Sequence, residues 1–104
     1  MSAVVTALIA DDEPLLRERL RGLLQRLWPE LAIVAEARNL VTTTSDITAH
    51  AETELVRVLE RDGKLGLLAT GTVVASTEPC PMCVGAMFWA GARHVVFGLS
   101  AARL

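Results

Sequence analysis

The stretch Val-Val-Thr-Ala-Leu-Ile-Ala at residues 4–10 is short, apolar and rich in β-branched side chains. A run of this kind predicts a strand buried on both faces of a sheet. Three later runs predict further strands, at residues 31–37, within residues 71–76 and at residues 94–97.

Helical patterns separate these runs. Between residues 15 and 28 the leucines recur with the 3.6-residue period of an amphipathic helix, and Pro29 ends that helix. Residues 39–45 predict a polar, threonine-rich loop. Asp46 is the expected N-cap of a second helix, for which Gly63 is the left-handed stop.

A third helix is predicted from about Pro79 to Gly91. Strands that alternate with helices predict an α/β fold with a parallel sheet, and 104 residues support one domain. We expect the large apolar side chains of this third helix to form core or an association surface. They are Met82, Met87, Phe88 and Trp89.

Composition narrows the functional classes. A net charge of −2 gives no electrostatic reason for strong nucleic-acid binding. No apolar run approaches the roughly 20 residues of a membrane span, and the first residues carry no basic leader region, so we expect a soluble, cytoplasmic protein without membrane partners.

Because one sheet face has only the helix at residues 15–28 to cover it, we also expect a homodimer.

Four residues point to a metal site. Cys80 and Cys83 are the only cysteines, and their spacing at a helix start suits a metal better than a structural disulfide. Zinc prefers four tetrahedral ligands, and three protein ligands leave one position for water. His50, Cys80 and Cys83 supply that number for Zn²⁺, and Glu52 is the candidate base that takes the proton of the water.

Each of these residues also has a simpler interpretation. Residues two apart on a helix point roughly 200° apart, so His50 and Glu52 share a site only at the helix tip. Alone, Glu52 is typical of a solvated helix acid and His50 of a satisfied polar side chain. An isolated Cys-x-x-Cys pair can be redox-active.

Two segments together resemble the cytidine deaminase-like superfamily, nearest to guanine, cytosine and tRNA adenosine deaminases. They are Asn-Leu-Val-Thr-Thr-Thr-Ser-Asp-Ile-Thr-Ala-His-Ala-Glu at residues 39–52 and Ser-Thr-Glu-Pro-Cys-Pro-Met-Cys-Val-Gly-Ala-Met at residues 76–87. The resemblance implies hydrolytic release of ammonia from a nucleobase or nucleoside. It implies a substrate contact for Asn39, for which turn formation is the alternative.

The opening of the chain resembles a response-regulator receiver domain. The matching text is Ala-Leu-Ile-Ala-Asp-Asp-Glu-Pro at residues 7–14 and Trp-Pro-Glu-Leu-Ala-Ile-Val-Ala-Glu-Ala at residues 28–37. In that family the acid pair, here Asp11 and Asp12, helps to hold Mg²⁺ beside a phospho-accepting aspartate after the third strand. The third predicted strand is followed here by Thr77 and Glu78, so we interpret the acids as a vestigial pair that forms a turn and favours a helix N-terminus.

Both families are open α/β sheets with strand order 2-1-3-4-5, which allows residues 1–38 of one type to continue into residues 39–104 of the other. The resemblances thus imply one domain, a three-layer α/β/α sandwich with a mainly parallel sheet of order 2-1-3-4, a flavodoxin-like and deaminase-like hybrid. We interpret the chain as a fusion, engineered in origin, with a natural gene as the alternative. Three functions remain open: a zinc-binding chimera with little turnover, an active zinc-dependent deaminase, and, more weakly, a signalling module.

Overall fold

Four strands form a single parallel sheet in the order β2-β1-β3-β4. The computed structural model describes residues 5–11 and 14–99. Within them the strands are β1 (Thr6–Ala10), β2 (Ala32–Ala37), β3 (Thr72–Thr77) and β4 (His94–Leu99). The predicted α/β class, parallel direction and strand order are confirmed.

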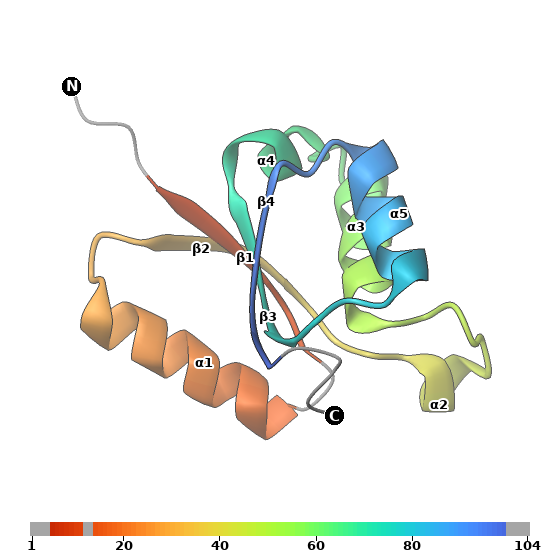
Figure 1. Cartoon of the computed structure of the whole chain (residues 1–104), viewed down its shortest axis with the longest axis horizontal. Coiled ribbons are helices and arrows are strands. Elements are labelled where there is room, and N and C mark those ends of the chain that lie inside the picture. The colour runs from red at the N-terminus through yellow and green to blue at the C-terminus, as the bar shows by residue number, and fades with distance from the viewer. Residues whose placement is uncertain (1–4, 12–13, 100–104) are drawn as a thin grey trace.

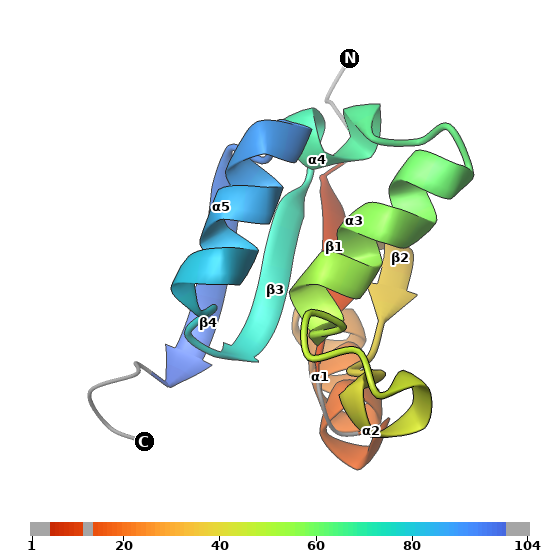
Figure 2. The same cartoon turned by 90° about the vertical axis from the view of Figure 1, so that its right-hand side faces the viewer.

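Helices cover both faces of this sheet, as Figures 1 and 2 show. Among the described residues, α1 (Pro14–Leu27) is the one helix on one face, and α3 (Ala51–Arg61) and α5 (Pro81–Ala90) lie side by side on the other. Two short helices, α2 (Val41–Thr44) and α4 (Gly66–Thr70), complete the order. The result is the expected three-layer arrangement.

The first apolar run of the sequence contains the central strand β1, and it has no polar face. Leu8 and Ala10 pack into the core that lies under α3 and α5, while Ile9 points to the opposite face and is also fully buried. Leu55, Leu59 and other α3 side chains close the same core. A strand that is buried on both sides requires the continuous apolar pattern seen at residues 4–10.

The second predicted helix begins later than expected. Asp46 is not its N-cap: the Asp46 Oδ1 atom accepts hydrogen bonds from the backbone N–H of Thr48 at 2.9 Å and from its hydroxyl at 2.6 Å. These bonds form a turn, and α3 starts at Ala51 with His50 as the N-cap residue. The prediction was wrong because aspartate stabilises such turns as readily as helix starts.

Other boundaries agree with the sequence pattern. Gly63 and Gly91 follow α3 and α5 with φ of 68° and 104°, the left-handed conformation expected of helix stops. The short helix α2 occupies part of the predicted polar loop. In the part of the chain that the structure describes, no helix combines the length and apolar character needed to cross a bilayer.

Candidate metal centre

His50 lies just outside a helix, at its N-terminal end. Its φ of −69° and ψ of 161° are extended, and α3 begins at the next residue. The roughly 200° separation between alternate residues applies only within a helix, so it does not part His50 from Glu52. The helix tip is the one place at which both residues can face a single site.

Backbone hydrogen bonds hold the segment that precedes His50. The backbone N–H of Leu40 donates to the carbonyl of Ala49 at 2.8 Å, and Ala49 N–H donates to the carbonyl of Asp46 at 3.0 Å. The buried hydroxyl of Thr53 donates to the carbonyls of Thr48 and, at 3.0 Å, His50. His50 therefore has a fixed position without itself belonging to a regular element.

The two cysteines occupy the corresponding end of α5. Cys80 is the N-cap residue, with φ of −70° and ψ of 165°, close to the values of His50. Pro81 takes the first helical position, which its fixed φ favours, and Cys83 lies one turn into the helix. Neither His50 nor Cys80 uses its side chain to cap its helix, which leaves both donor atoms to face the space between α3 and α5.

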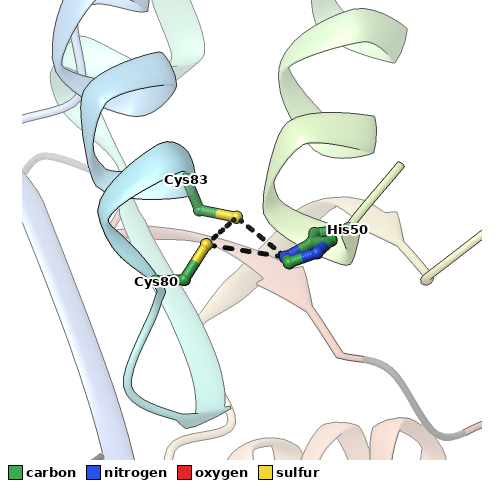
Figure 3. A group of neighbouring side chains, drawn as sticks. All are labelled: His50, Cys80 and Cys83. Carbon is green, nitrogen blue, oxygen red and sulfur yellow. Dashed lines mark hydrogen bonds between the residues drawn. The ribbon is translucent and has the colours of Figure 1, made fainter. Parts of the chain in front are cut away.

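Figure 3 shows that the three side chains converge. Cys80 Sγ lies 3.5 Å from Cys83 Sγ, and the His50 Nδ1 atom lies 3.6 Å from Cys80 Sγ and 3.5 Å from Cys83 Sγ. Zn–S bonds of about 2.3 Å and a Zn–N bond of about 2.1 Å place tetrahedral ligand atoms about 3.6–3.8 Å apart. The observed triangle therefore fits a zinc ion, with one coordination position left over.

The electrostatics of the triangle favour a cation. Burial raises the pKa of the Cys83 thiol, and its hydrogen bond with Cys80 and the negative charge of Glu52 raise it further. These effects all penalise a thiolate, and a nearby divalent cation would offset each of them. The side chain of Glu52, which is 8% exposed, thus lies close enough to influence Cys83 without being one of the three converging residues.

The remaining predicted site residues have different surroundings. The Asn39 side-chain oxygen accepts a hydrogen bond from Val41 N–H at 2.8 Å, which agrees with the turn-forming alternative. Asp11 is buried directly after β1, and its backbone N–H donates to the carbonyl of Ala37 at 3.2 Å. Asp12 lies outside the described residues.

Two supporting residues were not anticipated from the sequence. Thr53 holds the carbonyl of His50, as described above. Arg57 lies on α3, donates to the Thr48 hydroxyl at 2.7 Å and lies 3.4 Å from a carboxylate oxygen of Asp46. In the sequence Thr53 and Arg57 are ordinary polar residues of a helix, so only the folded position of the preceding turn reveals their role.

The sequence of this chain matches a known protein family and several known proteins. The family model described as the cytidine and deoxycytidylate deaminase zinc-binding region matches residues 29–99. A probable cytosine deaminase of Schizosaccharomyces pombe is 43% identical over 68 residues, and a guanine deaminase of Bacillus subtilis is 42% identical over 66. The X-ray structure of guanine deaminase from Bacillus subtilis superimposes with a TM-score of 0.60 at 40% identity, covering 69% of this chain and 46% of that one.

These matches cover different shares of the proteins compared. They take in 65% and 64% of this chain but only 40% and 42% of the two deaminases, so the chain spans about two fifths of the length of those relatives. An uncharacterized response regulatory protein of Vibrio cholerae is 59% identical over 50 residues, which are 48% of this chain and 19% of that protein. With residues 29–99 matched and the His/Cys/Cys triangle formed, the chain belongs to the cytidine and deoxycytidylate deaminase zinc-binding family, and its cofactor is Zn²⁺.

Proposed function

We propose that this chain is a deaminase-type domain in which His50, Cys80 and Cys83 hold the zinc ion and Glu52 transfers protons. The observation that carries the proposal is the convergence of three donor atoms, all within 4.8 Å of one another, from the N-terminal ends of two helices. Glu52 lies two residues after His50, in the first turn of α3, and is buried beside Cys83.

The chain's own residues would divide the chemistry as follows. A bound zinc ion supplies Lewis acidity and lowers the pKa of water at its open position. The Glu52 carboxylate accepts the proton of the attacking water and delivers it to the departing amino group, so that ammonia leaves as a neutral molecule. The N-terminal ends of α3 and α5 add partial positive charge that favours the two thiolates.

The proposed substrates are aminated nucleobases or nucleosides. Support comes from the relatives, which include a probable cytosine deaminase and a guanine deaminase. Asn39 is the proposed substrate contact, because it follows β2 at the carboxyl end of the sheet and its neighbour Leu40 is tied to Ala49. Ligands of open α/β sheets bind at this end of the strands.

For these 104 residues by themselves we propose slow turnover. Their matched part spans about two fifths of each deaminase relative. Orientation of the substrate supplies about 7–11 kcal/mol of a reaction barrier in favourable cases, so catalysis falls steeply when few residues confine the base.

Metal analysis tests the site. We expect one zinc per chain and its loss in the double variant Cys80→Ser, Cys83→Ser. Unchanged zinc content in that variant would refute the ligand assignment.

Ammonia release from cytosine, guanine or adenosine tests the chemistry separately. Any activity should disappear in Glu52→Gln while zinc remains bound. Glu60→Gln is the matched control, because Glu60 lies exposed near the other end of the same helix. Equal activity in Glu52→Gln and the unaltered chain would exclude Glu52 as the proton-transfer group.

We also propose that residues 1–38 are a receiver-like segment joined to a deaminase-like segment. The similarity to the Vibrio cholerae response regulatory protein supports this origin. The segment would serve as scaffold, since β3 is followed by Glu78 and not by an aspartate. Incubation with a small phosphodonor should therefore leave the aspartates unlabelled.

A further inference from the structure

The two cysteines of the metal centre also face each other as a pair of thiols, as Figure 3 shows. The thiol of Cys80 donates a hydrogen bond to the sulfur of Cys83 at 3.5 Å. A disulfide bond places its sulfurs about 2.05 Å apart, so these two need to approach by about 1.5 Å to be joined. Cys-x-x-Cys pairs at a helix N-terminus also occur as redox-active dithiols. The arrangement that fits a metal therefore fits an internal disulfide as well.

The backbone around the pair allows the sulfurs to approach. Cys80 precedes α5 with an extended backbone, and its side chain caps none of the helix N–H groups. Rotation of this side chain about its Cα–Cβ bond therefore breaks no hydrogen bond of the helix. Cys83 lies in the first turn of α5, within reach of the N-cap side chain. The disulfide would thus form within one helical turn.

The two sulfurs differ in their access to solvent. Cys83 is fully buried, whereas Cys80 is only partly buried. A small oxidant such as hydrogen peroxide therefore meets Cys80 first. Redox-sensing cysteines are typically accessible and lie next to a second, resolving cysteine. Cys80 has the position of the oxidised sulfur, and Cys83 has that of the resolving thiol.

We infer that Cys80 and Cys83 form a redox switch, in which a peroxide converts the zinc-free thiols into a disulfide that does not bind zinc. The sulfur of Cys80 attacks one peroxide oxygen and the O–O bond breaks. That oxygen stays on Cys80 as a sulfenic acid, and the other leaves as water. The sulfur of Cys83 then attacks Cys80, its thiol proton joins the departing hydroxyl group, and a second water leaves.

The electrons balance over the two steps. The cysteine pair loses two electrons and two protons, and hydrogen peroxide is reduced to two molecules of water. A small dithiol reverses the change by thiol–disulfide exchange, in which the added dithiol becomes the disulfide and both cysteine thiols return.

Oxidation would remove two of the three proposed zinc ligands. Zinc binds thiolates, and a disulfide has no thiolate to offer, so His50 would remain as the single donor of the three. This consequence rests on the proposed zinc site, whereas formation of the disulfide requires no metal. Bound zinc would occupy both sulfurs and should therefore slow their oxidation.

Peroxide titration of the zinc-free, reduced chain tests the inference. The end point should be one peroxide per chain, with both thiols lost and the mass lowered by two hydrogen atoms. Peptide mapping should place that loss at residues 80–83 and separate it from oxygen added to methionine. The oxidised chain should bind no zinc, and a dithiol should restore binding. Zinc-loaded protein should oxidise at least about tenfold more slowly.

Single serine variants form a matched pair that tests the difference in access. With peroxide and a diketone probe for sulfenic acids, Cys83→Ser should be labelled at Cys80, because no resolving thiol remains. Cys80→Ser should stay unlabelled, because Cys83 is buried. Circular dichroism of both variants checks that they fold, and the titration of the unaltered chain does not depend on them.

Four outcomes would overturn the inference. They are thiols that persist in the zinc-free chain, a disulfide that links two chains, an oxidised chain that binds zinc as tightly as the reduced one, and equal labelling of two folded serine variants. A reduced chain that binds no zinc would refute the proposed metal site. A chain that binds zinc but forms no disulfide would refute the switch alone.

Discussion

At the scale of single residues, the environment of Cys83 disfavours the negative charge of the thiolate that zinc would bind. Its side chain is fully buried, and burial raises the pKa of the thiol before Cys80 and Glu52 raise it further. Without a cation the group is therefore a neutral thiol at neutral pH. Zinc binds the thiolate, so binding must release the proton.

This raised pKa determines the direction of a pH effect. Because lower pH favours the neutral thiol, the apparent zinc affinity should rise with pH, about tenfold per unit for each proton released. Competition with a chelator from about pH 6.5 to about pH 8.5 measures the slope, and calorimetry in two buffers of different ionisation enthalpy counts the protons. A pH-independent affinity would contradict the raised pKa of Cys83.

At the scale of elements, hydrogen bonds at the start of α3 fix the backbone of His50 and of the turn that precedes it. The Thr53 hydroxyl donates to two carbonyls of the preceding turn, and Glu54 N–H donates to the carbonyl of His50 at 2.8 Å. Arg57 holds the same turn from one helical turn further along. Hydrogen bonds made by the neighbouring residues therefore orient the His50 imidazole.

The Thr53 hydroxyl can be removed with little change in shape. Thr53→Val should lower the free energy of unfolding by about 1–3 kcal/mol, because the carbonyls of Thr48 and His50 lose the hydroxyl that donates to both, and should weaken zinc binding as His50 gains freedom. Urea unfolding and chelator competition measure the two effects. Thr53→Ser keeps the hydroxyl and should retain most of the zinc affinity; equal losses in both variants would assign the effect to the missing methyl group.

At the scale of the whole molecule, the first strand of the chain, β1, pairs with β3, which lies more than sixty residues later in the sequence. Gly71, just before β3, lies against this contact. A Cβ atom at position 71 would lie 2.6 Å from Leu8 Cδ1, 2.8 Å from Thr6 Oγ1 and 2.9 Å from the carbonyl oxygen of Leu67. The close approach leaves room for glycine alone, so β1 packs tightly against the start of β3.

Gly71→Ala should therefore lower the free energy of unfolding by about 1–3 kcal/mol through overpacking. Gly22→Ala is the control, because Gly22 lies within α1 and a Cβ atom there meets nothing within 4 Å. That change should stabilise the protein by about 0.5–1 kcal/mol, since alanine favours a helix. A Gly71→Ala variant as stable as the unaltered chain would contradict the tight fit.

The sequence by itself determined the strands, the main helices and the three candidate ligands, and the strand order was implied by its resemblance to known families. Apolar periodicity is a local property, so runs such as residues 4–10 identify a buried strand without knowledge of the fold. His50, Cys80 and Cys83 likewise supply three ligands of the types that zinc prefers, which can be recognised without the fold.

The tertiary structure alone decided how those residues meet. The sequence could not distinguish Asp46 in a turn from Asp46 as a helix cap, and the start of α3 at Ala51 is what allows His50 and Glu52 to share a site. The parallel sheet then brings the N-terminal ends of α3 and α5 together across about thirty residues of chain. Such convergence depends on packing between segments that are far apart in the sequence. A sequence pattern does not state how far apart two such segments lie in space.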